Sequence, residues 1–99
     1  MRIDYAISIW NYSHHAVAGR LEDEIALIRG RNLGVELWGS WRGGPDLYSE
    51  ENRARLRPHL AGMAVSLHSA LGNSWDLHQR QIDAAADWGA RVIVLHSSD

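Results

Sequence analysis

The chain has 99 residues, of which 45% are hydrophobic and 22% are charged, a composition typical of one folded domain and not of a disordered chain. The formal net charge of −2 gives no overall basic surface, which disfavours a nucleic-acid partner. Cysteine is absent, which excludes disulfides and thiolate chemistry, and no run of 18 apolar residues occurs. We therefore expect a cytoplasmic protein with no membrane partner.

Four strand-like runs alternate with three helical segments along the chain. The predicted strands are residues 5–10, 35–38, 63–68 and 91–96. The last of these is almost entirely β-branched or leucine, which is typical of a parallel strand that is covered on both faces.

Helical spacing of apolar residues separates these strands. In the first helical segment the apolar positions recur every three or four residues, at Val17, Leu21, Ile25 and Ile28. The second is predicted to begin at the N-cap Ser49 and to bury Ala54, Leu56 and Leu60. Pro58 lies inside that segment and predicts a kink or an early end.

The third helical segment has a capping residue at each end. Ser74 is the predicted N-cap, and Gly89 is predicted to end the helix. Its apolar stripe is predicted at Leu77, Ile82, Ala85 and Ala86.

Regular alternation of strand and helix predicts an α/β fold with parallel strands, in a single partial domain spanning residues 1–99. The even strand spacing and the lack of a glycine-rich phosphate loop after the first strand favour half of a TIM-type (β/α)8 barrel over an open doubly wound sheet. Four strands alone would leave two sheet edges uncovered. We therefore expect the chain either to need the missing half of the barrel or to form a homo-oligomer.

Three of the predicted strands carry an ionisable residue at or near the carboxyl end, namely Glu36, His68 and His96. An unpaired charge inside a sheet that is covered on both faces is costly, so these residues indicate a solvent-accessible rim where a site can form. His68 and His96 could share a metal ion or a substrate oxygen, or could simply be hydrogen-bonded at the rim.

Residues 34–38, 65–70, 79–85 and 89–96, taken in this order and spacing, resemble the N-terminal half of the xylose isomerase-like barrels. That superfamily includes sugar phosphate isomerases and epimerases and the type IV apurinic endonucleases. The resemblance implies an eight-stranded barrel with a divalent metal site at its carboxyl end. In the endonuclease branch, histidines at the positions of His68 and His96 are zinc ligands. In the isomerase branch, later strands hold most metal ligands, and these histidines would touch substrate.

Two departures from the family pattern argue against the endonuclease branch. Ser-Ser-Asp follows His96 where many relatives carry Pro-Gly, and Ser69 follows His68 where Ala-Pro is frequent. We therefore expect the chain to be the N-terminal part of a metal-dependent sugar or sugar phosphate isomerase or epimerase, with Mn, Mg, Zn or Co as the ion. The alternatives are a zinc phosphodiesterase acting on abasic DNA and a non-catalytic half-barrel that self-associates.

The candidate site residues are assigned accordingly. His68 and His96 are the candidate metal ligands, and Glu36, Trp41 and Arg42 are the candidate substrate contacts. Glu36 could bind sugar hydroxyls or a histidine ring, or could pair with Arg42 as a structural bridge. Trp10 and Trp38 are assigned to core packing, whereas Trp41 lies in a glycine-rich loop. The acid and base residues are expected beyond residue 99, so the isolated chain is expected to be inactive.

Overall fold

The computed structural model describes residues 5–8, 20–39, 47–68 and 74–95. Four strands alternate with three helices, in the order β1 (Ala6–Ser8), α2 (Arg20–Gly30), β2 (Gly34–Trp38), α3 (Glu50–Leu60), β3 (Val65–His68), α4 (Trp75–Trp88) and β4 (Val92–Val94). The strands form one parallel sheet in sequential order, β1-β2-β3-β4. The predicted α/β class and the strand–helix alternation are therefore confirmed.

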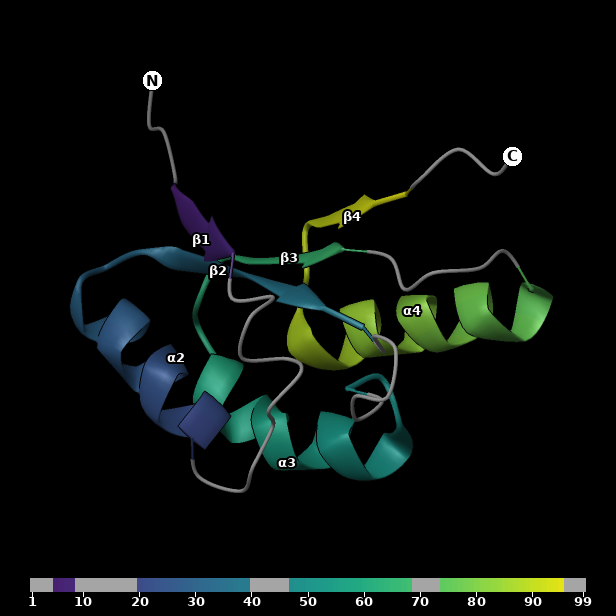
Figure 1. Ribbon diagram of the computed structural model, residues 1–99, viewed down its shortest axis with the longest axis horizontal. Coiled ribbons are helices and arrows are strands. Elements are labelled where there is room, and N and C mark those ends of the chain that lie inside the picture. The colour runs from purple at the N-terminus through teal and green to yellow at the C-terminus, as the bar shows by residue number, and fades with distance from the viewer. Residues whose placement is uncertain (1–4, 9–19, 40–46, 69–73, 96–99) are drawn as a thin grey trace.

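All three helices lie on one side of the sheet (Figure 1). Side chains on a strand alternate between the two faces, and in-register partners on parallel strands share a face. Val35 and Leu37 of β2 pair with Val65 and Leu67 of β3, and these four residues are buried beneath the helices. The opposite face, which we call the distal face, carries Ser8, Glu36, Trp38, Ser66, His68, Val92 and Val94.

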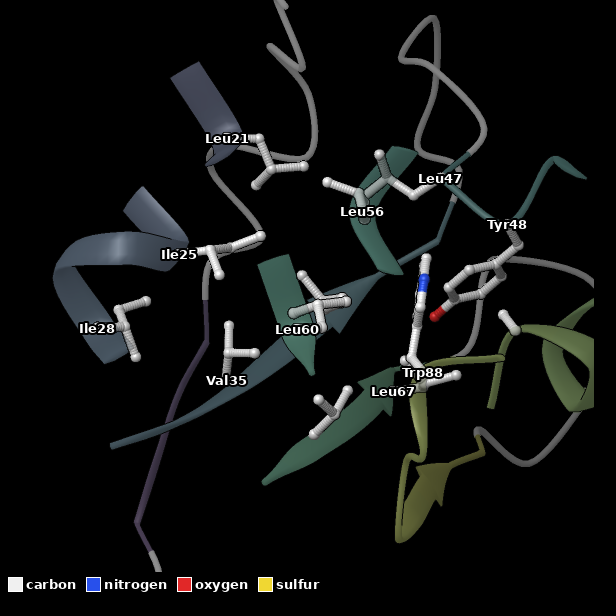
Figure 2. Packing of buried hydrophobic residues seen from close by; sticks show 13 residues of the cluster. Leu21, Ile25, Ile28, Val35, Leu47, Tyr48, Leu56, Leu60, Leu67 and Trp88 are labelled. Atoms are coloured by element: carbon white, nitrogen blue, oxygen red, sulfur yellow. The ribbon is translucent and has the colours of Figure 1, made fainter. Parts of the chain in front are cut away.

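The hydrophobic core fills the layer between the sheet and the helices (Figure 2). Helix α2 contributes Leu21, Ile25 and Ile28, as the helical spacing predicts, whereas Val17 lies outside the described residues. Helix α3 contributes Leu56 and Leu60, but the predicted core residue Ala54 is exposed. The segment before α3 adds Leu47 and Tyr48, both essentially inaccessible to solvent.

Helix α3 runs through Pro58 to Leu60, so it does not end early at the proline. Ala54 and Pro58 are both exposed, which lets water hydrate the Ala54 carbonyl, the usual acceptor of the N–H that proline lacks. At the end of the helix, the Arg29 side chain donates to the carbonyls of His59 and Ala61, the latter at 2.7 Å. These carbonyls would otherwise be orphaned at a helix C-terminus, so Arg29 stabilises the end that Pro58 would weaken.

Helix α4 begins and ends as predicted. The Ser74 hydroxyl accepts a hydrogen bond from the Leu77 amide at 3.2 Å, and Gly89 adopts a left-handed conformation with φ of 66°. The glycine is required there because a side chain disfavours positive φ.

The buried face of α4 differs from the predicted stripe. Its buried residues are Leu77, Gln81, Ala84 and Trp88, whereas Ile82 and Ala86 are exposed and Ala85 is partly buried. Contacts with α3 set this rotation: the Trp88 indole donates to the Arg53 carbonyl at 3.0 Å, and the Arg53 side chain lies 3.1 Å from Asp87. These contacts are invisible to a hydrophobic periodicity, which selected Ile82 over the polar Gln81.

Gln81 is 1% exposed, and neither its amide nitrogen nor its amide oxygen has a hydrogen-bond partner among the residues that the structure describes. A buried amide that loses its hydration without a replacement destabilises the folded state by about 1–3 kcal/mol. We therefore expect Gln81→Met, which keeps the unbranched shape and removes both polar atoms, to raise the free energy of unfolding in urea by about 1–2 kcal/mol. Gln79→Met on the exposed side of the same helix is the control and should change stability little. A loss of stability in Gln81→Met would contradict this account.

The described ends of the terminal strands differ from the prediction. Strand β1 covers residues 6–8 of the predicted 5–10, and β4 covers 92–94 of the predicted 91–96, so Tyr5, Arg91 and Leu95 lie outside the strands. Residues 9, 10 and 96 lie outside the described part. Within the described ranges, no helix has the length and apolar character needed to cross a membrane.

Candidate functional site

Glu36 and His68 meet on the distal face. Glu36 is the third residue of β2, and His68 is the last residue of β3, in register with Trp38. Because the register places Glu36 beside Ser66, His68 lies diagonally across from it, one step toward the carboxyl end of the sheet. The Oε1 atom of Glu36 lies 3.2 Å from the Nδ1 atom of His68.

The carboxylate of Glu36 determines which nitrogen of the His68 ring carries the proton. An ionised carboxylate can only accept hydrogen bonds, so Nδ1 of His68 is the donor to Glu36. Contact of this ring with a metal ion, or proton exchange with a substrate, then falls to Nε2. The side chains of His68 and Glu36 are 13% and 24% exposed, so neither is sealed from solvent. The histidine ring, one of the partners expected for Glu36, is therefore the one that the structure places in contact with it.

Trp38 packs against the face of the His68 ring. The two ring centroids are 3.5 Å apart and their planes differ by 9°, so the rings are stacked. The indole nitrogen of Trp38 donates to the hydroxyl of Ser8 on β1 at 2.7 Å. Trp38 therefore lies outside the buried cluster between the sheet and the helices. It lies on the distal face, because the period of two along β2 places it on the same side as Glu36 and opposite the buried Leu37.

The backbone of His68 is held from the core side. The hydroxyl of the buried Tyr48 donates to the His68 carbonyl at 2.6 Å, and the Tyr48 ring contacts the Trp88 ring edge-to-face at a centroid distance of 6.0 Å. The end of β3 is therefore tied to the residues that join the sheet to α3 and α4 (Figure 2).

Comparisons of the chain with protein-family models, curated proteins and solved structures found no match. The resemblance to the xylose isomerase-like barrels gains no support from them.

Several predicted site residues lie outside the described part of the chain. These are Trp41, Arg42 and His96, together with Trp10. Among the residues that the structure describes, no three histidine, aspartate or glutamate side chains gather where a metal ion could be held. The described part of the site therefore offers one histidine with its carboxylate partner.

Sequence reasoning identified Glu36 and His68 but missed Ser8 and Tyr48 as their neighbours. Ser8 carried a usable signal, since it is a polar residue between Ile7 and Ile9 in an apolar strand and so marks the distal face. Tyr48 carried none, because its role depends on the packing of the segment before α3 against the end of β3.

Proposed function

We propose that residues 1–99 form half of a (β/α)8 barrel and belong to a divalent-metal-dependent sugar or sugar phosphate isomerase or epimerase. The observation that carries this proposal is the Glu36–His68 pair, placed near the carboxyl end of a parallel sheet on the face opposite its helices. The carboxyl end of the strands is where barrel enzymes of this kind carry their catalytic groups.

The topology supports a barrel over an open doubly wound sheet. A doubly wound sheet reverses its strand order and places helices on both faces, whereas a barrel adds strands in sequence with every helix outside. Here the strand order is sequential, and α2, α3 and α4 cover the same face (Figure 1). On closure, the distal face would become the barrel interior, and the hydroxyls of Ser8 and Ser66 would line it beside Glu36.

The distribution of exposed apolar side chains supports further units at both ends of the sheet. The exposed large hydrophobic residues of the described part belong to or adjoin the outermost elements β1, α2, α4 and β4, and none lies on β2, α3 or β3: they are Tyr5, Ile7, Leu27, Trp75, Ile82, Val92 and Leu95. A finished surface would leave few such side chains in water. Additional strand–helix units, from the remainder of a barrel or from a second copy of the chain, would bury them.

The donor chemistry fits a divalent cation at one position. Neutral imidazole is a common ligand for zinc, manganese and cobalt, and a carboxylate on the opposite ring nitrogen is the usual device that orients it. We assign Nε2 of His68 as one ligand and His96 as another. His96 follows Val94, the β4 partner of His68, by two residues. When bound, such an ion polarises a carbonyl of the substrate.

The protein side chains then have separable tasks. Glu36 keeps a proton on Nδ1 of His68 and so presents Nε2 toward the carboxyl end of the sheet. Trp41 and Arg42 are assigned to substrate contacts, Arg42 through a phosphate or a hydroxyl. The groups that move the proton next to the carbonyl are assigned to the remainder of the barrel.

The test is solvent deuterium exchange catalysed by the complete gene product that contains this chain. The protein is incubated in D₂O with a panel of aldoses, ketoses and their phosphates, with manganese, magnesium, zinc or cobalt, and deuterium at the carbon next to the carbonyl is measured by NMR. Metal-dependent incorporation is expected, because isomerases and epimerases remove and return that proton. Zinc-dependent nicking of abasic DNA without exchange would replace the proposal by the phosphodiesterase. The absence of both activities in the assembled protein would contradict both the isomerase and the phosphodiesterase.

A further inference from the structure

The surroundings of the His68 ring point to two residues with a role beyond the Glu36–His68 pair. We propose that Trp38 and Ser8 are positioning residues that set the plane of the His68 imidazole, and with it the direction of Nε2. This inference rests on the proposed function for its purpose, but its geometry and its first test do not depend on that function.

A hydrogen bond at one ring nitrogen does not by itself fix the plane of an imidazole. The Nδ1–Glu36 contact fixes one edge of the ring but permits the ring to tilt about that contact. The stacked indole removes this freedom, since a ring held 3.5 Å from a second ring and within 9° of its plane cannot tilt without losing the contact. Tyr48 meanwhile holds the His68 carbonyl, so the backbone from which the ring projects is fixed as well.

Ser8 anchors the indole in turn. Trp38 is half-buried and belongs to the distal face rather than to the close-packed core. Its Nε1–H donates to the Ser8 hydroxyl at 2.7 Å, which fixes the far end of the indole to the neighbouring strand. The chain of contacts thus runs from β1 through β2 to β3.

This arrangement links the position of β1 to the site. Catalytic and metal-binding groups must be held within about 0.5 Å and 10–20° of their productive geometry. Ser8 is the last residue of β1, a three-residue strand that pairs with β2. A shift of this short strand would move the Trp38 indole, and the imidazole stacked on it would follow.

The distal face offers a matched control for Ser8. Ser8 and Ser66 flank Glu36 in register, one on β1 and one on β3, and the Trp38 indole bonds to Ser8. Ser8→Ala removes the anchor, Ser8→Thr keeps a hydroxyl on a strand position, and Ser66→Ala removes an equivalent serine on the other side. All three substitutions preserve the strand and should leave the fold intact by circular dichroism.

The first measurement is NMR of the metal-free protein labelled with ¹⁵N in its histidine rings, recorded above the usual titration range of histidine. In the wild type and in Ser8→Thr and Ser66→Ala, we expect a slowly exchanging Nδ1–H signal for His68. In Ser8→Ala we expect this proton to exchange faster and its signal to broaden. Unchanged His68 signals in Ser8→Ala, or equal changes in Ser66→Ala, would overturn the positioning role.

A second pair of variants tests the stacking itself. Trp38→Phe keeps an aromatic face but has no N–H to donate to Ser8, so its His68 signal should broaden as in Ser8→Ala. Trp38→Leu also removes the aromatic face, and its His68 signal should be lost. Equal signals in the two variants would overturn the role assigned to stacking.

The same variants separate this inference from the proposed function. If His68 ligates a metal, manganese or zinc affinity of the assembled protein should fall by about 10-fold in Ser8→Ala, as happens when the groups orienting a ligand are removed. Altered NMR signals in a protein that binds no metal would support the positioning role and contradict the metal site. Unaltered His68 signals in Ser8→Ala, in a protein that does bind metal, would support the metal site and contradict the positioning role.

Discussion

Gly34→Ala should destabilise the protein by about 3 kcal/mol, a large effect for the addition of one methyl group. A Cβ atom built on Gly34 lies 2.7 Å from the carbonyl oxygen of Ala64 and 3.2 Å from that of Tyr5. These oxygens are the hydrogen-bond acceptors that join β2 to its neighbours, since Gly34 donates to Tyr5 and Val35 donates to Ala64. The overlap is with backbone, so no rotamer change relieves it, and the three strands must separate locally.

The measurement is the free energy of unfolding in urea for the substituted and unsubstituted proteins. Gly30→Ala is the matched control, because a Cβ at Gly30, the last residue of α2, meets no atom of the described part of the chain within 4 Å. Alanine there should be neutral or stabilise the protein by up to about 1 kcal/mol, as it does at an unstrained helical glycine. Equal stability of Gly34→Ala and the wild type would mean that β2 does not approach β1 and β3 this closely.

The parts of the fold that follow from local physics could be predicted from the sequence. Leu21, Ile25 and Ile28 recur at helical spacing and are buried together, because one face of α2 meets the sheet. Ser49 and Ser74 cap the helices that follow them, because a serine hydroxyl satisfies an amide that the first helical turn leaves unpaired. Such features depend on a few neighbouring residues, all of which the sequence displays.

The parts that depend on tertiary contacts could not be predicted. The apolar spacing predicts that Ile82 is buried, whereas Gln81 is buried instead, because contacts of Arg53 and Trp88 across the α3 interface set the rotation of α4. Pro58 favours an early end of α3, but Arg29 from another helix holds the end of α3 at Leu60. In each case the deciding partner is about 30 residues away in the chain, so no local window contains it.

The candidate site divides in the same way. Glu36 and His68 stood out as ionisable residues at the ends of apolar strands, and a parallel register brings them to one face. A histidine ring is one of the partners expected for Glu36, but the sequence could not select it over a sugar hydroxyl or Arg42, because the contact depends on side-chain rotamers and on a diagonal approach. The face of Trp38 could also be predicted, because Trp38 follows the buried Leu37 directly and the period of two along a strand places it on the opposite side.

His68→Ala should lower kcat/KM of the complete gene product by about 10³-fold, an effect typical of the loss of a group that acts directly on a reaction, and should abolish metal binding at this site. The fold should survive, because the His68 side chain lies outside the buried core cluster and its carbonyl remains available to Tyr48. Turnover is measured with the substrate found by deuterium exchange, and metal binding by calorimetry. His59→Ala, an exposed histidine on α3, is the control and should change neither quantity. Retained turnover in His68→Ala would remove this residue from the site.

Two substitutions of Glu36 separate what its charge does from what its shape does. Glu36→Gln keeps an oxygen that can accept the Nδ1 proton of His68 but lacks the negative charge that makes the imidazole a stronger ligand. We expect metal affinity to fall by about 10-fold in Glu36→Gln and by about 100-fold in Glu36→Leu, the range found when a carboxylate behind a ligating histidine is lost. Equal losses in both variants would assign the effect to charge alone. Unchanged affinity in both would make the pair a structural contact between β2 and β3, with His68 then acting without help from Glu36.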